Sequence, residues 1–143
     1  RLKKQLQTKQ ISCDLFTEQK VPFQSSVLIL DTMGMLSSIY QYGNVAFIGG
    51  GFNNGIHNLL EPSVFGLPVL FGPNHQKFNE ANELINLKAG FEIANDDDFV
   101  KFLTRFLTNE DYLKATSTIS RNYVVSKSGG TAKIIEGLNP YFN

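Results

Sequence analysis

The sequence predicts an α/β fold built on a Rossmann-like, doubly wound parallel sheet. Short apolar runs rich in valine, leucine and phenylalanine alternate with longer stretches of helical periodicity. Glycine-containing turns follow three of these apolar runs, as is typical where parallel strands end. A length of 143 residues falls in the ordinary range of one globular domain, so we expect residues 1–143 to form a single domain.

The expected elements alternate along the chain. Residues 1–10 have the pattern of the end of a helix, with Leu2 and Leu6 one turn apart. The predicted strands are 27–30, 44–48, 68–71 and 91–93. The predicted helices are 35–42, 58–65, 79–87, 96–107, 111–126 and 130–138. Gly43 and Gly66 directly follow two of these helices, where glycine commonly ends a helix.

Composition excludes several classes of protein. Thirteen basic residues balance thirteen acidic ones, so we expect no nucleic-acid partner. Cys13 is the single cysteine, which excludes an internal disulfide and a cysteine-based zinc site. No apolar run is long enough to span a membrane, so we expect the chain itself to be soluble. It begins at Arg1 within a helical pattern, so we expect it to be a piece of a longer protein.

Residues that suit ligand binding follow three predicted strands, at 31–34, 49–51 and 72–74. The carboxyl ends of parallel strands meet at one edge of a sheet, so these turns should converge on one cleft. Gly49, Gly50 and Gly51 would let the backbone approach a phosphate, with His57 as a further contact. The pattern matches neither the dinucleotide fingerprint nor the P-loop motif.

The segment 58–61, Asn-Leu-Leu-Glu, has two interpretations. In the first it is a capping box, in which Asn58 accepts from the third helical N–H and Glu61 reaches back to the Asn58 N–H. In the second, Glu61 faces the cleft and accepts hydrogen bonds from two ribose hydroxyls, while Asn58 and the helix N-terminus hold a phosphate. Spacing alone does not choose between them.

Other polar residues have structural explanations at hand. Asp31 is expected to cap the turn or helix after it, and the acidic run 96–98 to begin a helix. His57 and His75 can each be local hydrogen-bonding residues. Neither histidine has a carboxylate or cysteine at metal-ligand spacing, so we expect no metal site.

Residues 31–79 carry a resemblance to a known family. The residues that match are Asp31-Thr32-Met33-Gly34, Tyr40, Val45-Ala46-Phe47-Ile48-Gly49-Gly50, His57-Asn58, Leu60-Glu61-Pro62, Phe65-Gly66, Pro68-Val69-Leu70-Phe71-Gly72-Pro73 and Phe78-Asn79. In this order and spacing they resemble the C-terminal domain of the 3-deoxy-D-manno-octulosonic acid (Kdo) transferases. Two features depart from the family pattern: Met35 stands where an acidic residue is usual, and the loop 51–56 is shorter.

The resemblance implies the C-terminal half of a GT-B fold, with residues 1–143 as the nucleotide-sugar-binding lobe. The N-terminal lobe, which would hold the acceptor and supply the catalytic base, lies outside this sequence. The cytidine would lie against residues 33–35, and the ribose and phosphate against residues 58–61. The implied nucleotide-binding residues are Met33, Gly34, Met35, Asn58, Leu59, Leu60 and Glu61.

The implied activity is transfer of Kdo from CMP-Kdo to the lipid A precursor lipid IVA, in lipopolysaccharide core biosynthesis of Gram-negative bacteria. An acceptor hydroxyl would attack the anomeric carbon directly with inversion, and CMP would leave. The implied partners are CMP-Kdo and, through the missing lobe, the lipid A precursor, with no cofactor. Membrane contact would come only from the missing N-terminal part, at the cytoplasmic face of the inner membrane. We expect this chain alone to be inactive.

Two alternatives stay open. Another GT-B enzyme, a UDP-sugar transferase or a sugar-nucleotide 2-epimerase, would share the glycines and the helix-borne glutamate. A noncatalytic module that binds a nucleotide would share the fold without the chemistry. The base preference of the nucleotide site would separate the enzymes, and a cleft that binds no nucleotide would favour a module for protein contacts.

Overall fold

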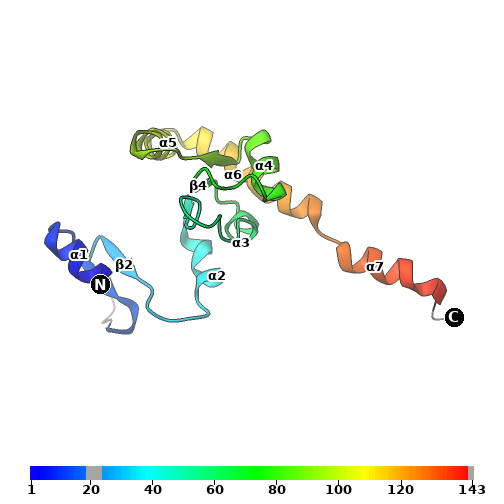
Figure 1. The fold of residues 1–143 in the computed structure, drawn as a ribbon, viewed down its shortest axis with the longest axis horizontal. Helices are drawn as coiled ribbons and strands as arrows, with labels where there is room; N and C mark the ends of the chain where they lie inside the picture. Colours follow the sequence, from blue (N-terminus) through cyan, green and yellow to red (C-terminus); the bar gives the residue numbers. More distant parts are fainter. Residues whose placement is uncertain (19–23, 142–143) are drawn as a thin grey trace. The chain divides into compact units, whose positions relative to one another are not determined.

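The computed structural model describes residues 1–18 and 24–141. Its residues form two compact units, Arg1–Ile39 and Tyr40–Asn143, and each is described here by itself. Figure 1 shows the order of the elements, from α1 near the N-terminus to α7 near the C-terminus. The expectation that residues 1–143 form a single domain stays a prediction.

The first unit is a small parallel pair of strands with short helices. Helix α1 (Leu2–Thr8) confirms the helical pattern at the start of the chain. Strands β1 (Cys13–Leu15) and β2 (Val27–Ile29) pair in parallel, with Cys13 opposite Val27 and Leu15 opposite Ile29. The turn η1 (Phe16–Glu18) follows β1, and helix α2 (Leu36–Ile39) ends the unit. β1 was not predicted, because its three residues, Cys-Asp-Leu, are too short a run for an alternating strand pattern to be recognised.

The second unit contains a three-stranded parallel sheet in the order β3-β4-β5. Its strands are β3 (Ala46–Ile48), β4 (Val69–Phe71) and β5 (Gly90–Glu92). All three residues of the central strand β4 are buried, as expected for a parallel strand covered on both faces. These strands confirm the predicted ones at 44–48, 68–71 and 91–93; the first two are shorter than predicted, and β5 begins and ends one residue earlier.

The helices of this unit begin with the turn η2 (Tyr40–Tyr42) and the short helix α3 (Leu60–Val64). They continue with α4 (Asn79–Asn86), α5 (Asp96–Thr108), α6 (Glu110–Lys127), α7 (Gly130–Leu138) and the turn η3 (Asn139–Tyr141). The helix predicted at 35–42 is instead α2 and the tighter η2, and the one predicted at 58–65 begins two residues later. Among the described residues, no helix has the length and apolar character to cross a membrane.

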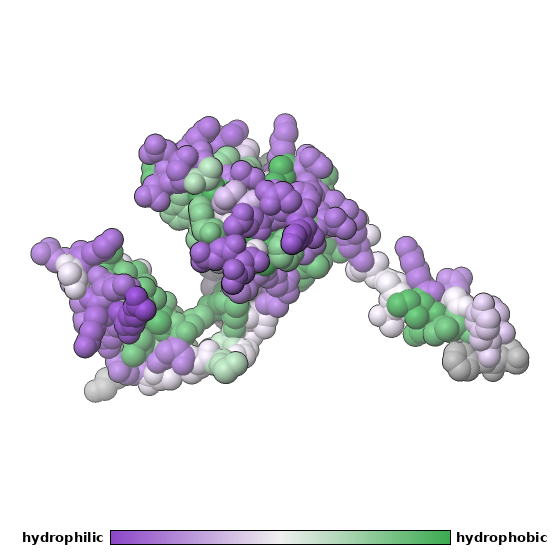
Figure 2. All heavy atoms as spheres, viewed as in Figure 1, coloured by the Kyte–Doolittle hydropathy of each residue, from purple (hydrophilic) through white to green (hydrophobic). Residues whose placement is uncertain are grey.

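Two apolar clusters cover the two faces of the sheet. Because side chains alternate along a strand, Val69 and Phe71 of β4 join one cluster and Leu70 joins the other. The first cluster includes Leu84 of α4 and Tyr123 of α6, and the second includes Phe106 of α5. Helices on both faces make the sheet doubly wound, as the sequence predicted. Figure 2 shows that polar residues cover much of the surface in this view.

One buried hydrogen bond ties α6 to the loop before β4. The hydroxyl of Ser120 donates to the carbonyl of Leu67 at 2.8 Å, and the Ser120 side chain is fully buried. Gly66 precedes this point with φ +79°, and a Cβ there would meet the carbonyl of Ser117 at 3.1 Å. Gly66 therefore ends the α3 turn in the left-handed conformation, as predicted, and lets α6 pack closely.

The packing of α5 predicts a sharp contrast between two neighbouring side chains. Phe106 is 2% exposed and packs on Phe91, whereas Leu107 is 74% exposed. We expect Phe106→Ala to lower the free energy of unfolding by about 3 to 5 kcal/mol, because it leaves a cavity in the second cluster. Leu107→Ala, the control, should change it by less than about 0.5 kcal/mol. Urea unfolding measures both, and equal losses would contradict this assignment of the core.

Candidate functional site

The loops after β3 and β4 touch through two glycines. A Cβ on Gly51 would lie 2.6 Å from the amide nitrogen of Gly72, and a Cβ on Gly72 would lie 2.6 Å from the carbonyl carbon of Gly51. No side chain fits at either position without a backbone shift. Gly51 and Gly72 therefore have a structural reason to be glycine, independent of any ligand.

Gly50 is fixed by its own loop. Its φ is +88°, and a Cβ there would lie 2.2 Å from the carbonyl oxygen of Gly55. The Gly50 carbonyl accepts hydrogen bonds from the N–H groups of Asn53 and Gly55 at 2.9 and 3.2 Å. The loop 50–55 is thus closed by its own backbone, and only glycine suits its first position.

Of Gly49, Gly50 and Gly51, only Gly49 could be a larger residue without a clash with the backbone. A Cβ there would meet only the ring of His57, at an ordinary contact of 3.6 Å, and the residue is exposed. The N–H of His57 donates to the Gly49 carbonyl at 3.2 Å. The exposed His57 ring and the Gly49 backbone therefore lie side by side, and together they are the part of the predicted phosphate loop that remains free to meet a ligand.

The turn after β4 braces this loop from the other side. The N–H of Asn74 donates to the carbonyl of Gly51 at 2.8 Å, and the Asn74 side-chain amide donates to the carbonyl of Asn53 at 2.9 Å. Two of the three predicted ligand-binding turns, 49–51 and 72–74, therefore converge at the carboxyl edge of the sheet, as expected.

Asn58 and Glu61 interact directly, but not as the predicted capping box. The Asn58 side-chain oxygen accepts from the N–H of Leu60 at 2.9 Å, and its amide donates to Oε1 of Glu61 at 2.9 Å. In a capping box, Asn58 would instead accept one residue later, and Glu61 would accept from the Asn58 backbone. The capping-box interpretation is therefore wrong in its geometry, because Asn58 makes the tighter turn to Leu60 and uses its amide to hold the carboxylate.

Leu59 and Leu60, which lie between Asn58 and Glu61, differ in whether their side chains can contact a ligand. Leu59 is 0% exposed and belongs to the first core cluster, so its side chain is not available to a ligand. Leu60 is partly exposed at the start of α3. Of the predicted residues 58–61, only Leu59 would have to act through its backbone.

Tyr40, which the sequence analysis named only among the residues that match the family, interacts electrostatically with Glu61. Burial raises the pKa of the Tyr40 hydroxyl, and the negative charge of Glu61 raises it further. The Tyr40 ring packs against the first core cluster. Its hydroxyl therefore stays protonated near neutral pH and is available as a hydrogen-bond donor.

The other predicted nucleotide-binding residues, Met33, Gly34 and Met35, belong to the first unit. Met33 is 99% exposed, Gly34 has φ +84°, and the hydroxyl of Thr32 contacts the sulfur of Met35 at 3.1 Å. The positive φ of Gly34 explains a glycine in this turn. That residues 33–35 and residues 58–61 bind the same nucleotide stays a prediction.

Asp31 anchors the start of this turn by a route that the sequence did not predict. Its carboxylate accepts from the N–H of Thr17 at 3.0 Å and from the Thr17 hydroxyl at 2.5 Å. The expectation that Asp31 caps the turn after it is replaced by this link to η1. The hydrogen bond from the Thr17 side chain is the main cause that lowers the pKa of Asp31.

His75 is a buried structural residue at the carboxyl end of β4. Its ring is 5% exposed, lies against Phe71, and contacts the Glu92 carboxylate through Nε2 at 2.6 Å. Nδ1 is buried and has no hydrogen-bond partner within residues 1–18 and 24–141. His75 thus links the turn after β4 to the last residue of β5, which is a structural hydrogen-bonding role, although with a partner distant in sequence. Among the described residues, no group of three His, Cys, Asp or Glu side chains could hold a metal ion.

Comparison with known proteins shows which enzymes the chain is similar to. No protein-family model matches it. It is 39% identical over 93 residues to 3-deoxy-D-manno-octulosonic acid transferase of Aquifex aeolicus, covering 64% of this chain and 26% of that protein. It is 32% identical over 124 residues to the enzyme of the same name from Chlamydia muridarum, covering 85% of this chain and 28% of that protein. The chain is thus similar in sequence to the Kdo transferases. It spans about a quarter of the length of these relatives.

Two further matches bear on this relationship. The structure resembles the crystal structure of the C-terminal CMP-Kdo binding domain of WaaA from Acinetobacter baumannii, with a TM-score of 0.74. At 24% identity, the match covers 84% of this chain and 64% of that chain, and it confirms the predicted fold class. A bifunctional glycosyltransferase/methyltransferase of Fusobacterium nucleatum is 38% identical over 80 residues, covering 54% of this chain and 12% of that protein.

The glycine geometry predicts different outcomes for two adjacent substitutions. Gly50→Ala should destabilise this chain by about 1 to 3 kcal/mol or more, because alanine is strained at φ +88° and collides with Gly55. Gly49→Ala should cost less than about 1 kcal/mol, since its Cβ meets only the His57 ring. Thermal or urea unfolding measures both. A Gly49→Ala variant as unstable as Gly50→Ala would show that Gly49 is also a packing residue.

The Thr17 link predicts a change in the titration of Asp31. Thr17→Val removes the side-chain hydrogen bond, so the pKa of Asp31 should rise toward its ordinary value. A lowered pKa stabilises the fold above the unfolded-state pKa, and this contribution is lost as pH falls through the folded-state pKa, so the variant should lose less stability on acidification. Carbon-detected NMR titration of the Asp31 carboxyl measures the pKa. Thr32→Val is the control, since the Thr32 hydroxyl contacts Met35 instead, and an equal shift in both variants would contradict the assignment.

Proposed function

We propose that this chain is the donor-binding lobe of a Kdo transferase, which moves Kdo from CMP-Kdo to the lipid A precursor lipid IVA. The observation that carries the proposal is the sequence relationship to several enzymes named 3-deoxy-D-manno-octulosonic acid transferase. The structural neighbour described as a CMP-Kdo binding domain supports the same donor. The acceptor and the catalytic base would be supplied by the part of the enzyme that this chain does not match.

Glu61 is the proposed ribose ligand. A carboxylate offers only acceptors, which suits two neighbouring hydroxyl donors. The Asn58 amide already holds Oε1 at 2.9 Å, which orients the exposed carboxylate and leaves Oε2 for the diol. Tyr40 contributes a protonated hydroxyl nearby. The pairing of Asn58 with Glu61 is therefore a pre-formed feature that fixes the direction of the carboxylate before ligand binds.

Gly49 and His57 are the proposed phosphate contacts. Gly49 is exposed and has no packing reason to be glycine, so its backbone can approach a phosphate oxygen closely. The exposed His57 ring beside it can donate an N–H. Gly50 and Gly51 would act indirectly, by holding the loop in this shape.

The proposed reaction is direct attack by an acceptor hydroxyl on the anomeric carbon of Kdo, with inversion and departure of CMP. The bond to the CMP phosphate oxygen breaks as the new glycosidic bond forms, and a base in the other lobe takes the hydroxyl proton. Negative charge grows on the departing phosphate, where the donors at Gly49 and His57 would stabilise it. Residues 33–35 would lie against the cytidine in the same proposal. We further propose that the whole enzyme acts at the cytoplasmic face of the inner membrane, anchored outside this chain.

The role of Glu61 can be tested by removing the diol and the carboxylate in turn. Calorimetric titration of the full chain should show that CMP binds about tenfold or more tightly than 2′-deoxy-CMP, because hydrogen bonds to a charged group are lost. In Glu61→Ala this ratio should fall to about one, as the partner of the 2′-hydroxyl is gone. Glu136→Ala, at an exposed carboxylate of α7, is the control and should keep the ratio.

Two results would count against the proposal. If Glu61→Ala keeps the preference for CMP over 2′-deoxy-CMP, Glu61 is not the ribose ligand. If the wild-type chain prefers UMP to CMP, the donor is a UDP-sugar, and the proposed substrate is wrong.

A further inference from the structure

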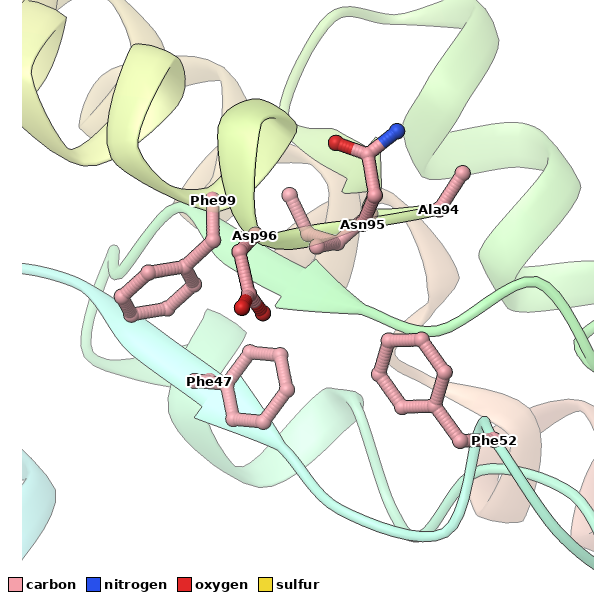
Figure 3. A pocket seen from close by; sticks show the side chains of 7 residues that line it. Phe47, Phe52, Ala94, Asn95, Asp96 and Phe99 are labelled. Atoms are coloured by element: carbon pink, nitrogen blue, oxygen red, sulfur yellow. The ribbon is translucent and has the colours of Figure 1, made fainter.

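A pocket lies at the carboxyl edge of the sheet, and none of the residues that line it has been assigned to the nucleotide. It has a volume of about 400 Å³. Its walls come from β3, from the loop after β3, and from the segment that joins β5 to α5. Three phenylalanine rings and the carboxylate of Asp96 line it. Figure 3 shows the Asp96 carboxylate turned toward the rings, and the amide of Asn95 turned away.

The aromatic walls are open to solvent. Phe47 is 49% exposed and Phe52 is 50% exposed, although both are large apolar side chains. Phe99 packs edge-on against Phe47, with ring centres 5.4 Å apart. The contact fixes the Phe47 ring, and Phe52 is held close to Gly72 by the loop after β3. The pocket therefore presents fixed aromatic surfaces to whatever enters it.

Asp96 differs from the acidic and polar groups next to it. Asn95 caps α5 by accepting from the N–H of Asp98 at 2.9 Å, and the Asp98 carboxylate accepts from the N–H of Ala94 at 3.1 Å. These two side chains are used to begin the helix. No hydrogen bond or ion pair of the Asp96 carboxylate occurs among the residues that the structure describes, and that carboxylate is exposed within the pocket.

We propose that this pocket binds the guanidinium group of an arginine side chain on a protein partner. A guanidinium is planar and carries N–H donors that match a carboxylate, and its faces stack on aromatic rings. The pocket supplies both features. The same chain already shows the stacking part, since Arg105 lies over the ring of Tyr112 at 3.6 Å from its centroid. The proposal does not depend on the proposed transferase activity.

The local charges favour a cation over the other occupants. A purely apolar group would cover Asp96 without giving it a partner, which is unfavourable. The N-terminus of α5 has a positive dipole end equivalent to about half a unit charge. Three carboxylates in its first turn, of Asp96, Asp97 and Asp98, outweigh that half charge, so the mouth of the pocket is negative.

The test uses NMR titration of the full chain with the peptide acetyl-Gly-Arg-Gly-amide. Its matched probe replaces arginine with citrulline, which has nearly the same shape and no charge. We expect the arginine peptide to shift the amide signals of Phe47, Phe52 and Asp96, and to bind about tenfold more tightly than the citrulline peptide.

Two variants separate the pocket from general acidity. Asp96→Asn should remove the preference for arginine over citrulline, while Asp97→Asn, which removes the same charge beside the pocket, should keep it. Equal binding of the two peptides to the wild-type chain would overturn the proposal. So would an Asp97→Asn variant that loses as much as Asp96→Asn, since nonspecific charge would then explain the binding.

Discussion

The candidate site depends on the backbone contact between Gly51 and Gly72. Parallel strands β3 and β4 end side by side, and their next loops must leave the sheet through the same small volume. Two glycines make this possible, because a Cβ at either position would lie 2.6 Å from the other backbone. Asn74 then bonds to both Gly51 and Asn53, and Gly50 closes on Gly55. The loop that follows β3 is therefore a rigid platform, which positions the exposed Gly49 and His57.

This platform gives pre-organisation to both proposed sites. On the nucleotide side, Asn58 fixes the carboxylate of Glu61 at the beginning of α3. On the other side, the loop after β3 carries Phe52 toward Gly72 and the segment after β5. Groups that are already oriented lose little conformational entropy on binding. One short loop thus supplies backbone to a proposed phosphate site and an aromatic ring to a proposed guanidinium site.

Local sequence patterns predicted most helices and strands. They could not predict contacts between residues that are distant in sequence. The apolar run of β4, the acidic start of α5 and the glycine after α3 are local signals, and each was confirmed. The consecutive glycines were read as a phosphate loop, because the contact of Gly51 with Gly72 spans twenty-one positions and has no sequence signature. The link of His75 to Glu92 was missed for the same reason. The capping-box prediction was wrong because Asn58 accepts from the N–H of Leu60 and not from that of Glu61, a one-residue difference that spacing cannot decide.

The central claim is that the carboxyl edge of this sheet binds the CMP part of a nucleotide sugar. The most direct measurement is an NMR titration of the full chain with CMP, UMP and ADP under the same conditions. The account predicts that CMP binds most tightly and that the largest shifts fall on Gly49, His57 and Glu61. Tighter binding of UMP or ADP, or CMP shifts confined to residues away from that edge, would contradict it.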